Sequence, residues 1–224
     1  MHKLEGKTDP VETVQEKHAL IVDAMAYVQQ SKTANKTFGE FSFDLLQRIL
    51  AVSYKASQID VVFDKYLDDS IKNVERNRRG SGRQLLFNTI VSSAPIKQWS
   101  LFLSCNENKI VLIKSIVSEW KQEKYLTEIG DKDFYVTDGE QIFKLHPNEV
   151  TAIQELFSNH EEADTRMILH AKHAYSTCSK VIISSPDTDY FVICLSMHQV
   201  IHGNLYFLTG VKNNRRIIDV SEVD

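Results

Sequence analysis

Three short, mainly apolar runs divide the chain, and each one leads into an aspartate. The runs are His18–Val22, Gln58–Phe63 and Val181–Ser184. An apolar run of four to eight residues that stops at a polar or turn residue is typical of a strand buried on both faces of a parallel sheet. The pattern therefore predicts three buried strands that run parallel to one another.

The rest of the pattern predicts helices and further strands around these runs. Helical spacing or helix-start residues predict helices over Ala24–Gln30, Phe41–Ser53, Ile110–Trp120, Val150–Phe157 and 161 to about 175. Short apolar runs predict strands over Phe134–Thr137, Gln141–Leu145, Phe191–Leu195, Leu205–Leu208 and Ile217–Val220. Asp138-Gly139, between the first two of these strands, is typical of a tight hairpin. Because strands alternate with helices, we expect an α/β fold in which helices flank a mainly parallel central sheet with a β-hairpin addition.

The length of the chain indicates how many domains it forms, and its net charge limits the partners that it can bind. The chain has 224 residues, 42% of them apolar, and a net charge of −4. This length suits one α/β domain, which we place at residues 18–224 after a polar lead-in at 1–17. The net charge gives no global signal for nucleic-acid binding, so any basic surface has to be local.

The number and spacing of the cysteines and the hydropathy of the chain argue against a secreted or membrane protein. Cys105, Cys178 and Cys194 are odd in number and widely spaced, which argues against a disulfide framework and a cysteine zinc site. No apolar stretch approaches the length of a membrane span, and the first residues lack the apolar core of a signal peptide. We therefore expect a soluble, intracellular protein, nuclear or cytoplasmic, with no membrane partner.

Aspartates at the ends of the predicted strands are the first candidates for a functional site. Asp187 and Asp189 follow Val181–Ser184, and Asp23 and Asp64 follow the other two strands. The carboxyl ends of strands in open α/β sheets are where ligands bind. Two carboxylates about 4 Å apart repel each other by roughly 4 kcal/mol at an effective dielectric constant of 20. Either these side chains diverge, or a cation lies between them.

A second acidic group opens the helix predicted from residue 161. In one interpretation Asn159 caps this helix with Glu162 as its capping-box partner, and the first-turn acids Glu161, Glu162 and Asp164 favour the helix dipole by about 0.3–1 kcal/mol each. In the other, one or two of these acids join the strand-end aspartates around a metal ion. Mg²⁺ takes oxygen ligands and draws carboxylates from more than one element.

The strand-end aspartates have structural interpretations as well. Asp23 could cap the following helix, and Asp64 could belong to a turn; for both, a role as metal ligand stays equally open. For Asp187 and Asp189 we favour metal ligands, since an Asx-turn explains one of them but not both.

The acids occur in an ordered set of motifs: LIVD, VVFD, EEAD and SPDTD. This set resembles the PIN-like superfamily and, within it, the structure-specific 5′ nucleases of the flap-endonuclease and xeroderma-pigmentosum-G type, including the Asteroid-like branch. The resemblance spans about Ala19 to the C-terminus and extends to animal proteins with HEEADTR and SPDTD motifs. It implies a three-layer PIN-like fold that binds Mg²⁺ or Mn²⁺. The metal-site acids that it implies are Asp23, Asp64, Glu162, Asp164, Asp187 and Asp189.

This chain departs from the family pattern in several places. Asp164 stands where the family has a second glutamate, and Glu161 lies outside the pair. A Gly-Cys-Asp segment, which supplies a further metal acid in the resembling proteins, is missing, and so is the helix-hairpin-helix that holds duplex DNA. Residues 18–224 are therefore expected to lack the C-terminal part of the domain.

The resemblance implies a metal-dependent nuclease that hydrolyses phosphodiester bonds of DNA or RNA by a two-metal mechanism. The ions would be held by Glu162, Asp164, Asp187 and Asp189, and the remaining two acids would complete the cluster. The alternative is a catalytically inactive PIN-like scaffold that binds nucleic acid or protein. A phosphatase or glycosyltransferase that uses Asp187 and Asp189 as a DxD motif is a weaker third interpretation.

A basic segment follows the second predicted strand, with Lys72, Arg76, Arg78, Arg79 and Arg83. Such a run is usually a solvated helix face, and its other interpretation is phosphate binding. In the resembling nucleases the segment at this place engages the scissile phosphate. The resemblance thus implies nucleic-acid contacts for Lys72, Arg76 and Arg79.

Two other groups are interpreted as structural. Lys212–Arg216 reads as a surface turn between the last two strands. The pairs His170/His173 and His198/His202 have spacings found in zinc sites, but no third ligand accompanies them.

Overall fold

The computed structural model describes residues 17–66, 86–159, 163–198, 203–210 and 215–222. In these residues one eight-stranded sheet has the order β5-β4-β3-β2-β1-β6-β7-β8. Its strands are β1 (His18–Asp23), β2 (Gln58–Val62), β3 (Asp133–Asp138), β4 (Gln141–His146), β5 (Glu149–Ala152), β6 (Lys180–Ser184), β7 (Asn204–Thr209) and β8 (Arg216–Asp219). The five central strands, in the order β3-β2-β1-β6-β7, run parallel to one another. At the two edges of the sheet, β4, β5 and β8 are added by antiparallel pairing.

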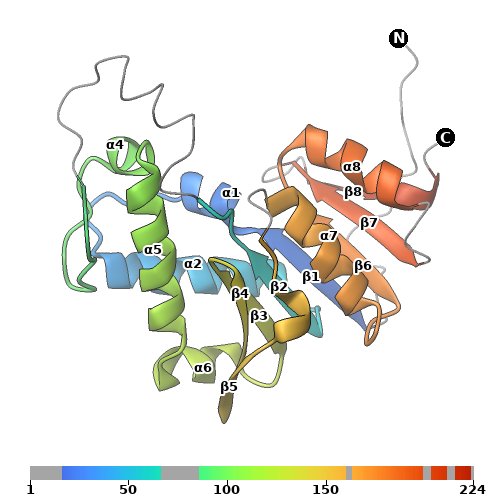
Figure 1. The fold of residues 1–224 in the computed structure, drawn as a ribbon, viewed down its shortest axis with the longest axis horizontal. Helices are drawn as coiled ribbons and strands as arrows, with labels where there is room; N and C mark the ends of the chain where they lie inside the picture. The colour runs from blue at the N-terminus through green and yellow to red at the C-terminus, as the bar shows by residue number, and fades with distance from the viewer. Residues whose placement is uncertain (1–16, 67–85, 160–162, 199–202, 211–214, 223–224) are drawn as a thin grey trace.

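Helices cover both faces of the sheet, so the α/β fold has three layers (Figure 1). One face carries α1 (Ala24–Gln29), α2 (Phe38–Val52), α4 (Trp99–Leu103), α5 (Asn106–Trp120) and α6 (Glu123–Ile129). The other face carries α7 (Ala163–Ala174) and α8 (Thr188–His198). None of the helices in the described ranges is long and apolar enough to cross a membrane.

The central strand β1 shows how one sheet supports two hydrophobic cores. Leu20 and Val22 pack with the helices of the first face, whereas Ala19 and Ile21 pack with α7 and α8. Successive side chains of a strand point to opposite faces, so a strand between two helical layers is apolar at every position. The three predicted apolar strands are confirmed, and they lie side by side as β2, β1 and β6.

Two predicted elements are wrong. Val150–Phe157, predicted as a helix, contains β5 and a short 3₁₀ turn, because the chain reverses so that Glu149 pairs with His146 at the edge of the sheet. Phe191–Leu195, predicted as a strand, lies within α8. A short apolar run cannot be assigned to a helix or a strand by its periodicity alone. The other predicted helices and strands are confirmed, with small shifts at their ends.

The chain leaves β1 and β6 toward opposite sides of the sheet. β1 leads through α1 and α2 to β2, whereas β6 leads through α8 to β7. The two strands are neighbours, with Val22 paired to Ser184. Their carboxyl ends therefore form the topological switch point at which open α/β sheets bind ligands.

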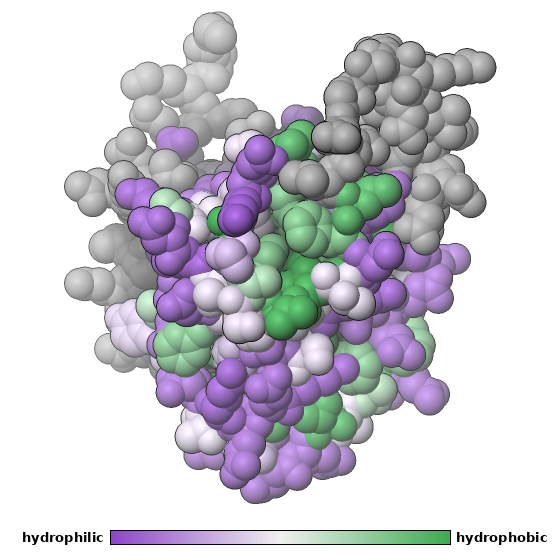
Figure 2. Space-filling view, turned by 90° about the vertical axis from the view of Figure 1, so that its left-hand side faces the viewer, coloured by the Kyte–Doolittle hydropathy of each residue, from purple (hydrophilic) through white to green (hydrophobic). Residues whose placement is uncertain are grey.

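Some large apolar side chains stay exposed on the first helical layer. Figure 2 shows apolar residues among hydrophilic ones on the face that carries α4 and α5. Exposed side chains from this layer and the segment before α4 are Phe43, Leu86, Phe87, Val91 and Leu101. The ring of Phe87 also packs edge-on against Phe102, with 5.3 Å between centroids, so aromatic contacts hold this segment on α4.

Candidate functional site

Asp23 ends β1 at the switch point, and both of its carboxylate oxygens accept hydrogen bonds. Oδ1 accepts from the backbone N–H of Ala26 at 3.1 Å, which makes Asp23 the N-cap of α1. Oδ2 accepts from the hydroxyl of Ser185 at 3.3 Å. Asp23 thus caps a helix, as its position in the sequence allowed, and its side chain also reaches the end of β6.

Ser185 joins the two acids at the switch point. Its Oγ accepts from the backbone N–H of Asp187 at 3.2 Å and donates to Asp23. Oδ1 of Asp187 in turn accepts from the backbone N–H of Asp189 at 2.9 Å, in the first turn of α8. The carboxylate of Asp23 and the backbone N–H of Asp187 therefore bind the same hydroxyl group. Ser185 was not among the predicted site residues, although a serine directly after a buried strand was a signal for it.

Asp64 continues the row of acids on the other side of β1. Asp64 comes two residues after β2, where Val62 pairs with Asp23, and Asp187 comes three residues after β6, where Ser184 pairs with Val22; both therefore follow the strands that flank β1. Neighbouring strands are about 4.8 Å apart. The hydroxyl of Tyr66 donates to Oδ2 of Asp64 at 2.8 Å.

Glu140 extends the row to the hairpin turn after β3. Nζ of Lys65 donates to its Oε1 at 2.7 Å and to the backbone carbonyl of Asn159 at 3.4 Å. The hydrogen bond and the charge of Lys65 lower the pKa of Glu140. Carboxylates thus follow four neighbouring strands at one edge of the sheet. We call this row the acidic rim: Glu140, Asp64, Asp23 and Asp187.

Arg166 of α7 lies beside the acidic rim and is almost fully buried, at 1% exposure. Its Nη1 donates to the backbone carbonyl of Phe63 at 3.0 Å. Burial lowers the pKa of the Arg166 guanidinium, and the carboxylates of Asp64 and Glu140 oppose this shift. Sequence analysis did not select Arg166. Its position directly before the apolar residues Met167 and Ile168 of the predicted helix was the available signal.

A buried polar network ties α7 to β2 underneath the rim. Nδ1 of His170 lies 2.6 Å from Oδ1 of Asp60, and both residues are closed off from solvent. Nε2 of Gln58 donates to the other carboxylate oxygen of Asp60 at 2.8 Å, and the hydroxyl of Thr177 donates to Gln58 at 3.0 Å. His170 thus pairs with an aspartate inside a strand, and this network sets where Arg166 lies on the sheet.

The predicted site residues fall into two groups. Of the metal-site acids, the structure describes the side chains of Asp23, Asp64, Asp187 and Asp189. It brings the first three to the acidic rim, and Asp189 is exposed on α8. The predicted site residues that lie outside the described side chains are Glu162, Asp164, Lys72, Arg76 and Arg79. Among the side chains that are described, no group of three or more histidines, cysteines, aspartates or glutamates is arranged to hold a metal ion.

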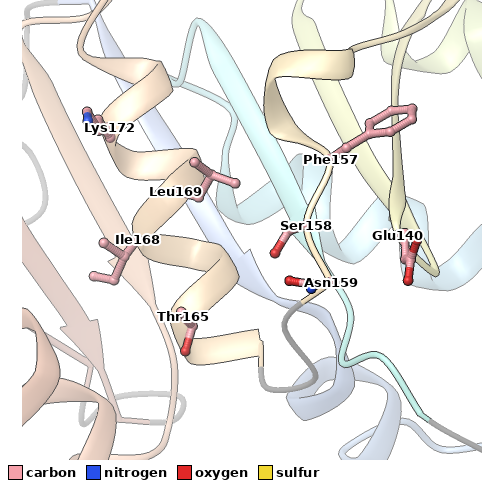
Figure 3. Close-up of a pocket in the computed structure, with 8 residues that line it drawn as sticks. All are labelled: Glu140, Phe157, Ser158, Asn159, Thr165, Ile168, Leu169 and Lys172. Carbon is pink, nitrogen blue, oxygen red and sulfur yellow. The ribbon is translucent and has the colours of Figure 1, made fainter.

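A pocket of about 460 Å³ opens next to Glu140, between α7 and the segment that follows β5. Figure 3 shows Ser158 and Asn159 pointing toward α7, and Thr165 on the first turns of that helix. Lys172 lines the pocket further along α7. The pocket therefore begins at the acidic rim and runs along the outer side of α7.

The acidic rim and this pocket are the candidate site. Compared with known proteins, the chain matches no family model, no curated protein and no solved structure.

Proposed function

We propose that the protein is a divalent-cation-dependent phosphodiesterase that acts on DNA or RNA, as the resemblance to PIN-like 5′ nucleases implies. The observation that supports it is that the hydroxyl of Ser185 donates to the carboxylate of Asp23 and accepts from the backbone N–H of Asp187, so that two acidic residues far apart in the sequence lie close together at the switch point. Asp64 follows the neighbouring strand β2 two residues after its end. Carboxylates from several strands attract divalent cations, and hydrolysis of a phosphodiester needs such charge neutralisation.

The donor atoms of the acidic rim suit Mg²⁺ or Mn²⁺. They are carboxylate oxygens from different strands, which is the ligand type that these hard cations prefer. A bound ion would supply an activated water molecule and neutralise charge on the phosphate oxygens. Asp23 and Asp187 would hold the ion; Ser185 would orient the side chain of Asp23, and the backbone N–H of Asp189 that of Asp187. Glu162, Asp164 and Asp189 stay predicted as further ligands.

Asp23→Asn and Asp187→Asn separate metal binding from helix capping. Asparagine caps a helix about as well as aspartate, so both variants keep their helix starts while they remove a carboxylate charge. We expect Mn²⁺ to raise the melting temperature of the unchanged protein by mass action, and to raise it much less in either variant.

Asp219→Asn is the matched control for this experiment. Oδ1 of Asp219 accepts from the backbone N–H of Ser221 at 2.9 Å, at the end of β8 and away from the rim. We expect this variant to respond to Mn²⁺ like the unchanged protein. A melting temperature of the unchanged protein that stays the same in millimolar Mn²⁺ would contradict metal binding.

Cleavage of 5′-flap DNA and single-stranded RNA in Mn²⁺ tests the reaction itself. Charge stabilisation by a metal supplies several kcal/mol, so we expect the Asp187→Asn/Asp189→Asn protein to lose at least about 100-fold in rate. EDTA should abolish cleavage by the unchanged protein. Equal rates in the double variant and the unchanged protein would show that these acids do not perform the reaction.

A catalytically inactive scaffold is the second candidate. One observation favours it: both carboxylate oxygens of Asp23 accept hydrogen bonds within the protein, as those of a structural capping residue would. Such a scaffold would bind nucleic acid or protein without cleaving it. Its melting temperature would not respond to Mn²⁺, whereas that of the phosphodiesterase would.

A further inference from the structure

Two nitrogens of the Arg166 guanidinium have no hydrogen-bond partner in the part of the chain that the structure describes. Nη1 is satisfied by the carbonyl of Phe63, but the buried Nε and Nη2 have no acceptor among the described residues. These two nitrogens form the side of the guanidinium that binds carboxylate or phosphate with two parallel hydrogen bonds. Buried donors without an acceptor are rare and call for an explanation such as an absent ligand.

The charges around Arg166 do not replace this missing acceptor. Asp64 and Glu140 interact with it electrostatically, yet neither of them accepts a hydrogen bond from Nε or Nη2. Burial nevertheless lowers the pKa of Arg166, which means that the two carboxylates only partly offset the cost of burying the cation. A bound anion would therefore stabilise the buried charge of the guanidinium further.

Lys65 is a second cation that interacts with Glu140. Lys65 directly follows Asp64, and its side chain is 16% exposed where it pairs with Glu140. The side chain of Glu140 is 60% exposed and lines the pocket beside α7. Glu140 therefore interacts with both cations, and it is the one of these groups that can move away into solvent. Exposed ion pairs are weak, so an incoming anion can replace Glu140.

We propose that Arg166 and Lys65 form a phosphate-binding site in which Glu140 takes the hydrogen bond of Lys65 when no phosphate is bound. The phosphate would accept from the Arg166 fork and from Nζ of Lys65, and Glu140 would turn outward. This site goes beyond the proposed hydrolysis and does not depend on it, because phosphate binding by two cations needs no metal ion.

Titration with inorganic phosphate in the presence of EDTA, followed by calorimetry on the full chain, tests the site. Glu140→Gln removes the competing carboxylate, and since such a pair is weak we expect phosphate to bind about two- to fivefold more tightly. Lys65→Gln and Arg166→Lys should each weaken binding by about tenfold or more, because each removes charge-assisted hydrogen bonds. Circular dichroism checks the fold of Arg166→Lys, and if this variant unfolds, the variants Glu140→Gln and Lys65→Gln decide.

The ion pair between Lys144 and Asp133 provides the matched control. Its atoms are 2.5 Å apart at the other end of the β3–β4 hairpin, and both side chains are similarly exposed to solvent. We expect Asp133→Asn and Lys144→Gln to leave the phosphate affinity unchanged. The proposal is overturned if the protein does not bind phosphate, or if the Glu140 and Lys65 variants bind it no differently from these controls.

Competition with oligonucleotides distinguishes two sources of the phosphate. If the ligand is the end of a nucleic acid, a 5′-phosphorylated single strand should displace inorganic phosphate, and the same strand without its 5′ phosphate should not. If the ligand is a small phosphate compound, neither strand should displace it. Both results support the site; displacement by both strands alike, unaffected by Lys65→Gln, would show unspecific binding to the backbone and overturn it.

Discussion

Asp60 and His170 are the residues on which the position of α7 depends. Asp60 is part of a strand that is buried at every position, and its two oxygens bind His170 and Gln58. Burying a carboxylate is costly unless it is paired and hydrogen-bonded, and here both conditions are met. The pair fixes the position of α7 along β2, and thereby holds Arg166 over the end of that strand.

Replacing Asp60 should therefore be strongly destabilising. Asp60→Ala leaves buried hydrogen-bonding groups of His170 and Gln58 without their partner, so we expect the free energy of unfolding to fall by about 3–5 kcal/mol. Asp60→Asn keeps a hydrogen-bonding side chain of the same shape and should lose less. Urea denaturation at pH 7 measures both. A loss below about 1 kcal/mol for Asp60→Ala would mean that the pair does not hold α7.

These residue contacts lay beyond what the sequence could predict. Asp60 interrupts an apolar run, but nothing in the sequence connects it with His170 on a distant helix. The same is true of Arg166 and of the pair between Lys65 and Glu140. Contacts between side chains on different elements depend on how those elements pack, and this packing cannot be predicted from the local sequence pattern.

At the scale of elements, the first turn of α2 lies against the segment that precedes α4. Thr37 and Glu40 form a capping box, and the backbone N–H of Gly39 donates to the carbonyl of Ser92 at 2.8 Å. A methyl group at position 39 would overlap the hydroxyl of Ser92. The absence of a side chain at Gly39 therefore lets the segment before α4 lie against the first turn of α2.

Gly39→Ala is expected to destabilise the protein even though alanine favours helices. Overlap in a packed region costs about 1–3 kcal/mol, which exceeds the gain of about 1 kcal/mol in helix propensity. Gly39→Ala/Ser92→Ala should recover most of the loss, and Ser92→Ala alone serves as the control. Thermal unfolding in which Gly39→Ala is as stable as the unchanged protein would contradict this close approach.

The elements themselves were largely predictable from the sequence. Continuous apolar runs identified β1, β2 and β6, because strands between two helical layers have no polar face. The error at Phe191–Leu195 has the same origin, since a short apolar helix and a short buried strand look alike. That Asp23, Asp64 and Asp187 follow neighbouring strands was predictable, because the carboxyl ends of parallel strands meet at one edge of the sheet.

At the scale of the whole molecule, one sheet couples two separate cores. Leu46 lies in the core under α2 and α5, and Met167 lies in the core under α7 and α8, both without exposure to solvent. The strands β1 and β2 contribute side chains to both cores. Loss of packing on one face should therefore weaken the sheet as a unit.

Leu46→Ala and Met167→Ala test this coupling. Each removes a buried side chain and should lower the free energy of unfolding by about 2–5 kcal/mol. We expect every variant to unfold in a single transition, with fluorescence and circular dichroism giving the same midpoint. Two separate transitions in either variant would show that the cores unfold independently.

The place of β1 between β2 and β6 also has a consequence during protein synthesis. His18 pairs with Lys180, so a strand made near the beginning of the fold waits for a partner made near its end. Until β6 leaves the ribosome, one edge of β1 has no neighbour, and an open apolar edge is a place where other chains can attach. Asp23 is therefore made early, but it meets Ser185 and Asp187 only once almost the whole sheet has been translated.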